Sequence, residues 1–331
     1  MSTIIPIFFT FDSNYVTAAA VTFRSMLENA DHTYQYRLYV LHAGIPERLR
    51  KRLYRVVAHF ANAELGFINV ARFDNELITT AKSHFSKEIY YKLLAAEIFP
   101  QYDRILCSDV DVVFTGDIAP SFFAFDGDDF YYAGVGQITH DDRRIAKYNA
   151  NFTPDEIDTL RHEIAAGYLL FNLKAMRADG TDKRVPQYYC DNYHRLLLPE
   201  QDCLILCCWP KVRHLAMEYV VSNSFYRLDA ASVEFDHYNP QLPSDTAERI
   251  EWFTSALAHP VQVHYVGPNK PWNSLGVPRQ GLWFRYLWRS RQILPYLAEI
   301  PHHISLRLKR YSLRRFINKQ INRFKRRPTT H

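Results

Sequence analysis

Apolar runs and amphipathic segments alternate along the first part of the chain. Runs with the length and the Val, Ile and Phe content of buried strands span residues 4–11, 36–41, 65–70, 105–114, 131–136 and 167–173. Segments typical of helices lie between the first four runs, at residues 16–29, 46–60 and 87–99. Pro100 ends the last of these helices. The alternation predicts an α/β fold in which helices cover both faces of a mostly parallel sheet.

Two carboxylates interrupt the apolar run at residues 105–114, which reads Ile-Leu-Cys-Ser-Asp-Val-Asp-Val-Val-Phe. Strand alternation would place Asp109 and Asp111 on one face, and burying a carboxylate is costly unless something pairs with it. A divalent cation would compensate both charges, and Mg²⁺ or Mn²⁺ is often held by one or two carboxylates plus substrate phosphates. A strand end with both carboxylates facing solvent would explain the pattern equally well.

The positions of the acidic residues favour a ligand site at one edge of the sheet. Ligands of parallel sheets bind beyond the carboxyl ends of the strands, and Asp12 and Asp109 both follow predicted strands. The chain has no Gly-x-Gly-x-x-Gly motif and no phosphate-binding loop, which argues against dinucleotide and ATP binding.

A second informative segment, residues 263–272, reads Val-His-Tyr-Val-Gly-Pro-Asn-Lys-Pro-Trp. His264 could be a third metal ligand, Lys270 could neutralise a phosphate, and Gly267 would let the backbone approach a ligand closely. A single histidine is more often a core residue, but its combination with the aspartate pair favours a metal site.

Together these segments resemble glycosyltransferase family 8, and within it the bacterial lipopolysaccharide α-galactosyltransferases and α-glucosyltransferases. The resemblance covers nearly the whole chain and rests on four motifs in the family's order. These are Phe-Asp-Ser-Asn-Tyr at 11–15, Ser-Asp-Val-Asp at 108–111, Gly-Tyr-Leu-Leu-Phe-Asn-Leu at 167–173 and His-Tyr-Val-Gly-Pro-Asn-Lys-Pro-Trp at 264–272. A looser fifth is Glu-Gln-Asp at 200–202.

The resemblance implies a GT-A fold and transfer of a hexose, galactose or glucose, from a UDP-sugar with retention of anomeric configuration. It implies Mn²⁺, with Mg²⁺ as the alternative, held by Asp109, Asp111 and His264. The UDP moiety would be bound by Thr10, Asp12, Asn14, Tyr15, Val110, Gly267 and Lys270. Within this set, Tyr15 would stack on the base, Asp12 would read its edge, and Gly267 and Lys270 would contact the diphosphate.

The catalytic residues implied by the resemblance are Lys92, Glu200 and Gln201. Lys92 stands where the family usually has an arginine, and Glu200 where it often has an aspartate. Ala165 replaces a family asparagine, so one hydrogen bond to the sugar is missing or supplied elsewhere. The amide of Gln201 is a poor nucleophile, which favours front-face displacement over a covalent intermediate. Mn²⁺ and Lys270 would then stabilise the leaving diphosphate, whose oxygen can take the acceptor's proton.

The net charge of +5 conceals a strong asymmetry. Ten basic residues and no acidic one follow Pro301, so the remaining chain holds 30 basic residues against 35 acidic ones. On a helix, one face of this segment would carry apolar residues: Leu306, Leu313, Ile317, Ile321 and Phe324. We therefore predict that residues 302–331 bind an anionic membrane surface, where a lipid-linked acceptor would be found. A solvated tail, a tail packed on the body, or nucleic-acid binding, which is less favoured, are the alternatives.

These features predict residues 1–270 as a GT-A catalytic domain and residues 271–331 as a helical, basic membrane-association region. We find neither a signal-peptide pattern nor an apolar stretch of about 20 residues, which predicts a cytoplasmic protein on the inner face of the membrane. The five cysteines, an odd number, are typical of reduced thiols rather than a disulfide framework. The acceptor would be lipopolysaccharide or another lipid-linked or cell-surface glycan.

Two rival functions remain open at this point. A metal-dependent nucleotidyltransferase would use the aspartate pair on a nucleoside triphosphate, but it would need a Gly-rich basic loop near the first strand, where residues 11–15 have neither property. A non-catalytic, membrane-associated carbohydrate-binding protein would not need the intact Asp109, Asp111 and His264.

Overall fold

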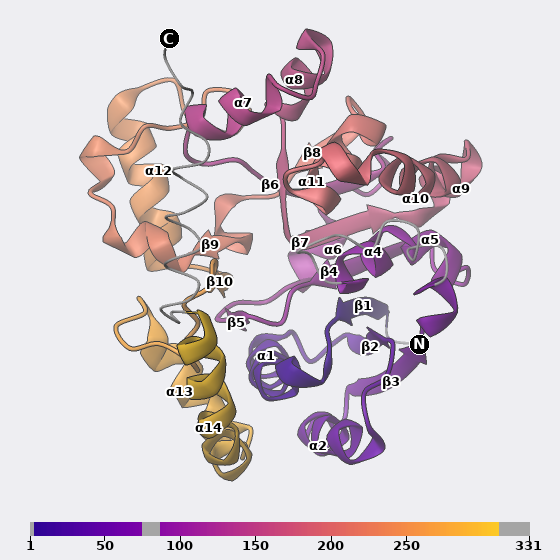
Figure 1. The fold of residues 1–331 in the computed structure, drawn as a ribbon, viewed down its shortest axis with the longest axis vertical. Helices are drawn as coiled ribbons and strands as arrows, with labels where there is room; N and C mark the ends of the chain where they lie inside the picture. Colours follow the sequence, from indigo (N-terminus) through magenta and orange to yellow (C-terminus); the bar gives the residue numbers. More distant parts are fainter. Residues whose placement is uncertain (1–2, 75–86, 311–331) are drawn as a thin grey trace, which may run out of the picture.

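A seven-stranded sheet runs through the centre of the molecule (Figure 1). The computed structural model describes residues 3–74 and 87–310, with only the backbone for the last five. The strand order is β3-β2-β1-β4-β7-β6-β8. Their bounds are β1 Ile4–Thr10, β2 Gln35–His42, β3 Ala63–Asn69, β4 Arg104–Ser108, β6 Tyr132–Gly136, β7 Ile164–Asn172 and β8 Val212–His214. The first four strands of this order are parallel, and β7 runs antiparallel to both neighbours. The predicted mostly parallel sheet is confirmed.

Helices cover both faces of this sheet. The α-helices are α1 Val16–Asn29, α2 Glu47–Val57, α4 Lys87–Leu93, α5 Ala95–Ile98, α6 Ala119–Phe123, α7 Asp142–Tyr148, α8 Pro154–Leu160, α9 Leu173–Ala178, α10 Thr181–Asn192, α11 Pro199–Cys208, α12 Thr246–Ala258, α13 Gln280–Arg289 and α14 Ile293–Arg310. Short 3₁₀ helices are η1 Ser13–Tyr15, η2 Ala71–Phe73, η4 Tyr193–Arg195, η5 Met217–Tyr219, η6 Asn223–Arg227 and η7 Ala230–Ser232. The helix predicted at residues 87–99 is interrupted at Leu94.

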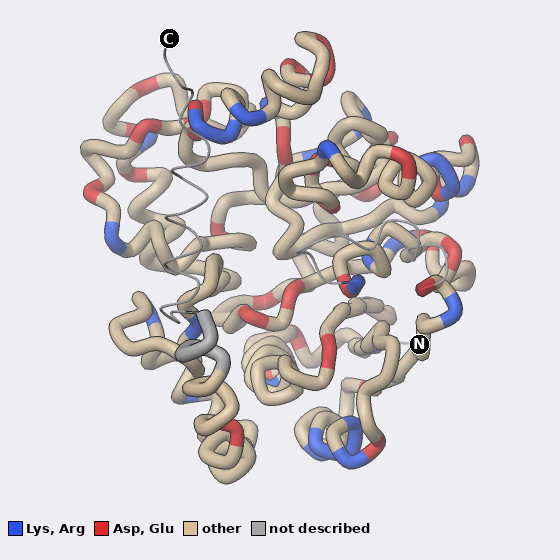
Figure 2. Tube along the Cα trace, viewed as in Figure 1, with Lys and Arg blue, Asp and Glu red and all other residues tan. Residues whose placement is uncertain are grey.

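Strand alternation divides the core into two large apolar clusters. Along β1, Ile7 and Phe9 face a cluster that includes residues of α1 and α2. Phe8 between them faces the other cluster, which includes residues of α4, α10 and α11. Basic residues lie along α2 (Figure 2).

The prediction of one strand over residues 105–114 is wrong. The run divides into β4 and β5 (Val112–Phe114), and β5 belongs to a second sheet of order β5-β10-β9, completed by β10 Gln262–His264 and β9 Val221–Ser222. The hydroxyl of Thr22 lies 2.8 Å from the carbonyl oxygen of Val110 and 2.9 Å from that of Val112. The chain therefore turns at Asp109–Asp111, and strand alternation is not what brings these two residues together.

The C-terminal helices pack beside α1. Trp283 and Leu287 of α13 are fully buried in a cluster with Val21, Val113 and Tyr265 of the body. The carboxylate of Glu299 in α14 accepts a hydrogen bond from Thr17 of α1 (2.8 Å). The domain boundary at residue 270 stays a prediction.

The predicted basic tail lies largely outside the described residues. The backbone of α14 is described to Arg310, whereas residues 311–331 and the side chains from Leu306 onward, with the predicted apolar face, are not. Within the part of the chain that is described, no helix is long and apolar enough to cross a membrane.

Candidate functional site

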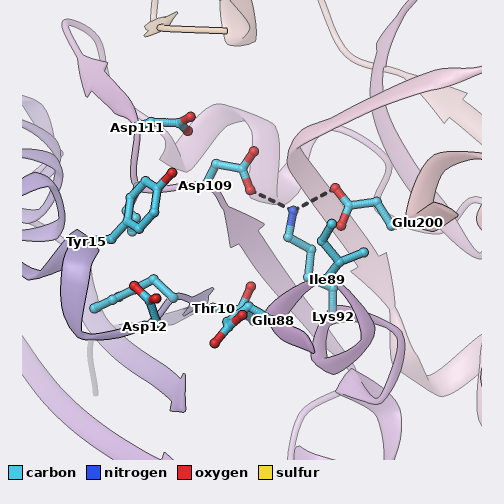
Figure 3. Close-up of a pocket in the computed structure, with 11 residues that line it drawn as sticks. Thr10, Asp12, Tyr15, Glu88, Ile89, Lys92, Asp109, Asp111 and Glu200 are labelled. Atoms are coloured by element: carbon cyan, nitrogen blue, oxygen red, sulfur yellow. Dashed lines mark hydrogen bonds and ion pairs between the residues drawn. The ribbon is translucent and has the colours of Figure 1, made fainter. Parts of the chain in front are cut away.

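A cavity of about 240 Å³ lies where β1 and β4 end, beside the connection that leads from β4 into the second sheet (Figure 3). Its walls come from β1 and the turn after it, from α4, from the β4–β5 connection and from α11. The lining residues are Thr10, Phe11, Asp12, Tyr15, Glu88, Ile89, Lys92, Asp109, Val110, Asp111 and Glu200. This is the edge at which parallel sheets bind ligands.

The two aspartates converge with His264 because hydrogen bonds fix the chain on both sides of their turn. The amide of Asp109 donates to Gly167 of β7 (3.0 Å), and the amide of Tyr265 donates to the carbonyl of Asp111 (3.0 Å). His264 of β10 pairs with Val112 of β5, directly after Asp111. Its Nε2 atom lies 3.2 Å from Asp111 Oδ1 and 3.6 Å from Asp109 Oδ2.

Gly167 makes room for the histidine. A Cβ atom at this position would lie 2.6 Å from two atoms of the His264 ring, a distance that real contacts do not reach. The absence of a side chain in the Gly-Tyr-Leu-Leu-Phe-Asn-Leu motif is therefore required by the packing of His264 beside Asp109.

The residues present fit a divalent cation. One ligand atom from each of Asp109, Asp111 and His264 lies within 4.8 Å of the other two. Carboxylate oxygens suit Mn²⁺ or Mg²⁺, and an imidazole nitrogen favours Mn²⁺. Lys270 donates to Asp111 and to the carbonyl of Tyr265. Burial raises the pKa of Asp111, but His264 and Lys270 outweigh burial and hold that pKa well below its ordinary value.

Lys92 is a buried cation between two carboxylates (Figure 3). Its Nζ atom donates to Asp109 Oδ1 (2.7 Å), to Glu200 Oε1 (3.1 Å) and to the carbonyl of Ala166 (3.2 Å). Burial lowers the pKa of Lys92, but Asp109 and Glu200 outweigh burial and raise it well above its ordinary value. The ammonium therefore stays charged, and it is a fixed positive group at the wall of the cavity.

Glu200 presents an unsatisfied oxygen. Burial raises its pKa to about 7, with Lys92 opposing this effect and Asp109 adding to it. Its Oε2 atom is buried and makes no hydrogen bond with any described residue. Because a buried acceptor without a partner is costly, a proton on Glu200 or a hydroxyl of a bound ligand would relieve it.

The opposite wall of the cavity is more exposed. Asp12 caps η1: its Oδ1 atom accepts from the backbone amide of Asn14 and its Oδ2 atom from the side-chain amide, each at 2.8 Å. The ring of Tyr15 packs edge to face against Trp272, with a centroid distance of 5.9 Å. An exposed aromatic ring beside an immobilised carboxylate is suited to binding a planar, polar-edged group.

Most of the residues predicted as a site are brought together. Eight line the cavity: Thr10, Asp12, Tyr15, Lys92, Asp109, Val110, Asp111 and Glu200. His264 and Lys270 contact Asp111, and Asn14 contacts Asp12. The remaining two predicted residues do not line it either: Gln201, next to Glu200 on α11, and Gly267, whose φ of 75° is in the region that favours glycine.

Sequence reasoning missed two residues of α4 that line the cavity. Glu88 and Ile89 lie four and three positions before Lys92, so they share its helix face. That spacing was the available signal, and applying it to Lys92 would have found both. Phe11, the other lining residue not predicted, belongs to the first motif.

Comparisons with known proteins identify the family. The profile of glycosyl transferase family 8 matches residues 6–276. General stress protein A of Bacillus subtilis (strain 168) is 22% identical over 277 residues, which are 80% of this chain and 85% of that protein.

Solved structures agree on the fold. The bifunctional glycosyltransferase WbbM superposes with a TM-score of 0.68 at 20% identity, over 91% of this chain and 52% of the other, so this chain spans about half of WbbM. The galactosyltransferase LgtC, solved with donor and acceptor sugar analogues, gives 0.61 at 20% identity, over 86% of this chain and 96% of LgtC. These likenesses confirm the predicted GT-A fold. A family of this kind takes a nucleotide-sugar donor and a saccharide acceptor. The chain is therefore a glycosyltransferase and belongs to glycosyl transferase family 8.

Proposed function

We propose that this chain transfers a hexose, galactose or glucose, from a UDP-sugar to a saccharide acceptor with retention of anomeric configuration, assisted by Mn²⁺. The observation that carries the proposal is the convergence of Asp109, Asp111 and His264 at the edge of a cavity that also holds Lys92 and Glu200. An oxygen-rich cation site beside a pocket of mixed charge suits a sugar diphosphate.

The diphosphate end of the donor would lie at Asp111. A metal held by Asp109, Asp111 and His264 supplies charge stabilisation for the departing diphosphate. In the structure, the ammonium of Lys270 donates a hydrogen bond to the carboxylate of Asp111. Its ammonium would exchange this carboxylate for a phosphate oxygen when the donor binds, and it would hold the negative charge that develops as the glycosidic bond breaks.

The sugar end would lie between Lys92 and Glu200. The unsatisfied oxygen of Glu200 would bond a sugar hydroxyl, and Lys92 holds Glu200 and Asp109 in place. With Ala165 in the position of the family asparagine, these two side chains supply polar contacts on that side. Gln201 would lie beneath the anomeric carbon, and its amide would assist a front-face displacement rather than form a covalent intermediate.

The uridine would bind on the exposed wall, with Tyr15 stacking on the base and Asp12 reading its edge. In the structure both oxygens of Asp12 bond to Asn14, so base recognition requires that at least one of these hydrogen bonds be shared. Thr10 and Val110 would contact the ribose side, and Gly267 the diphosphate.

The acceptor would be lipopolysaccharide or another lipid-linked glycan, reached on the cytoplasmic face of the membrane. What supports this part is a set of large apolar side chains exposed in the C-terminal part of the described residues: Leu275, Trp288, Leu294, Leu297 and Ile304. Leu275 is 92% exposed and Leu294 78%. Exposed apolar residues, together with the ten basic residues that follow Pro301 in the sequence, suit an anionic bilayer.

The donor is tested by measuring Mn²⁺-dependent release of UDP from UDP-galactose and UDP-glucose, with ADP-glucose and GDP-mannose as comparisons. We expect release of UDP from at least one of the two UDP-sugars, and little release of nucleoside diphosphate from ADP-glucose or GDP-mannose. Tyr15→Leu should weaken UDP binding at least about 5-fold, since base stacking contributes about 1–3 kcal/mol. Tyr54→Leu, at an exposed tyrosine outside the cavity, should not.

Two results would contradict the proposal. One is equal release from ADP-, GDP- and UDP-sugars, which would remove the role of the uridine site. The other is formation of pyrophosphate from UTP and a hexose 1-phosphate in place of sugar transfer, which would indicate a nucleotidyltransferase.

A further inference from the structure

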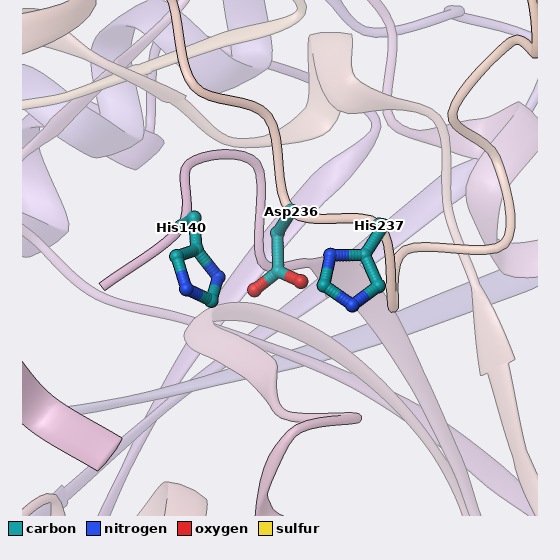
Figure 4. Close-up of side chains that lie close together, drawn as sticks. All are labelled: His140, Asp236 and His237. Carbon is teal, nitrogen blue, oxygen red and sulfur yellow. The ribbon is translucent and has the colours of Figure 1, made fainter. Parts of the chain in front are cut away.

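A second group of metal-ligating side chains lies away from the cavity. It consists of His140, Asp236 and His237, and one ligand atom of each lies within 4.8 Å of the others (Figure 4). Figure 4 shows the carboxylate of Asp236 between the two imidazole rings. None of the three lines the cavity described above.

The backbone brings these side chains together from residues almost 100 positions apart. Thr139 and Phe235 form an antiparallel bridge, in which the amide of His140 donates to Glu234 and that of Asp236 donates to Ile138, each at 3.0 Å. In this register His140 and Asp236 are diagonal neighbours on the same face, close enough for their side chains to meet.

A turn then redirects the chain so that His237 reaches the same point. The Asp236 side chain accepts a hydrogen bond from the amide of Tyr238 (3.0 Å), and its carbonyl accepts one from Asn239 (3.1 Å). Asp236 is 5% exposed, and after Asp142 it is one of the carboxylates that raise the pKa of His140. A buried carboxylate without a counter-charge is costly, and a cation would compensate it.

We propose that His140, Asp236 and His237 form a second metal site, specific for a divalent transition metal such as Zn²⁺. Two imidazoles and one carboxylate are a ligand set of zinc sites, with a fourth position left for water. His140 Nε2 lies 2.8 Å from Asp142 Oδ1, so a carboxylate orients one ligating ring from behind, as is usual around bound zinc. The nitrogen-rich set differs from the oxygen-rich set at Asp109 and selects a different metal.

The site would link two segments whose residues Ile138 and Phe235 belong to one apolar cluster. One is the connection from β6 to α7, and the other is the irregular stretch before α12. Apart from the bridge, a hydrogen bond from Asn239 to the carbonyl of Gln137 (3.1 Å) links them. A metal at this point would act as a clip between the segments and would stabilise the folded state by mass action.

The test is a count of bound Zn²⁺ on full-length protein without an affinity tag, by equilibrium dialysis and elemental analysis. Wild type should bind one equivalent more than His237→Ala. His237 is exposed, so its removal should leave the fold intact. His259→Ala, at another exposed histidine outside the group, is the matched control and should bind as wild type does.

Affinity and spectra sharpen the count. Loss of a ligand in His140→Ala or His237→Ala should lower the affinity of this site for Zn²⁺ by at least about 100-fold. Asp142→Asn should lower the same affinity by about 10-fold or more. Co²⁺ at the site should give the visible absorption bands of a four- or five-coordinate ion, and these should disappear in His237→Ala. Asp111→Asn should remove a different equivalent and leave these bands unchanged. Equal Zn²⁺ stoichiometry and affinity in wild type and His237→Ala would overturn the proposal.

Discussion

The molecule has two buried clusters that each contain one cation and two carboxyl groups. Each cluster includes one residue of helix α11. The Lys92 cluster consists of Lys92, Asp109 and Glu200. The Arg144 cluster consists of Arg144, Glu163 and Asp202. Glu200 and Asp202 are two positions apart on a helix and so point to nearly opposite sides. The clusters have the same kinds of charge, but they differ in what surrounds them.

The Arg144 cluster is closed. Asp202 is fully buried and accepts hydrogen bonds from the hydroxyl of Tyr148 (2.5 Å) and the amides of Leu197 and Leu198 (2.7 and 3.1 Å). Glu163 pairs with Arg144 (2.7 Å). Burial raises the pKa of Glu163 well above its ordinary value, with Arg144 opposing and Asp202 adding to the effect. The hydrogen bonds that Asp202 accepts from Leu197 and Leu198 fix the start of α11.

The Lys92 cluster is open. Asp109 and Glu200 line the cavity, and one oxygen of Glu200 has no hydrogen-bond partner among the described residues. Buried charge alone therefore does not mark a binding site, whereas an unsatisfied group at the wall of a cavity does. Substitutions in the Lys92 cluster should affect both stability and sugar transfer, and substitutions in the Arg144 cluster should affect stability alone.

The largest effect is expected from Lys92→Met, which leaves two buried carboxylates without their cation. The folded state should lose about 3–5 kcal/mol, because breaking a buried pair leaves an uncompensated charge. Sugar transfer should fall at least about 100-fold, the loss typical of one preorganised electrostatic group. Lys92→Arg restores the charge and should recover part of both. Urea unfolding and initial rates measure the two effects, and a Lys92→Met enzyme within a few-fold of wild type would show that the cluster does not serve the site.

Asp202→Asn should affect stability without affecting chemistry. The amide keeps one acceptor for Tyr148 but places a donor against the amides of Leu197 and Leu198. A cost of about 2–3 kcal/mol is expected, since hydrogen bonds to a charged group are lost. Well below the melting temperature, the rate of sugar transfer should stay within about 3-fold of wild type, because the molecules that remain folded keep an unchanged cavity. A large loss of rate with unchanged stability would remove the distinction between the clusters.

Gly167→Ala should weaken metal binding specifically. The new methyl group would meet the ring of His264 and push it away from Asp109. The Mn²⁺ concentration for half-maximal activity should rise about 10-fold, as expected when the support of a metal ligand is disturbed. Gly281→Ala is the matched control, because a Cβ there contacts nothing within 4 Å on helix α13. Equal metal dependence in the two variants would argue against a ligand role for His264.

A further effect concerns pH. The pKa of Glu200 is raised from 4.5 to about 7 in the folded protein, so the folded state holds a proton that the unfolded state releases. Its contribution to stability is complete below pH 4.5 and is lost as the pH rises through 7, at no more than about 1.4 kcal/mol per pH unit. In metal-free protein, Glu200→Gln should flatten the stability profile between pH 4.5 and 7. Denaturant unfolding at several pH values checks this, and parallel profiles for the two proteins would contradict the raised pKa.

Local patterns in the sequence were sufficient for the sheet and for most of the cavity. The period-2 alternation of Ile7, Phe8 and Phe9 and the four ordered motifs depend on neighbouring residues alone. The division of residues 105–114 was not predictable in this way, because Thr22 and Tyr265, both distant in sequence, fix that turn.

Sequence patterns also do not predict which isolated residues from separate elements meet in a site. Glu88 and Ile89 enter the cavity only because α4 is oriented toward it, although their spacing from Lys92 was visible. His140 and Asp236 meet through one bridge between segments that have no pairing signal of their own. Propensity and periodicity describe elements, whereas such meetings depend on how the elements pack.

The central claim is that the Lys92 cluster adjoins a metal and nucleotide site, whereas the Arg144 cluster does not. Electron paramagnetic resonance of free Mn²⁺ tests it directly, by counting the ion bound with and without UDP. We expect one UDP-dependent Mn²⁺ per chain in wild type, the same in Glu163→Gln, and none in Asp111→Asn. Undiminished UDP-dependent Mn²⁺ binding by a folded Asp111→Asn protein would contradict it.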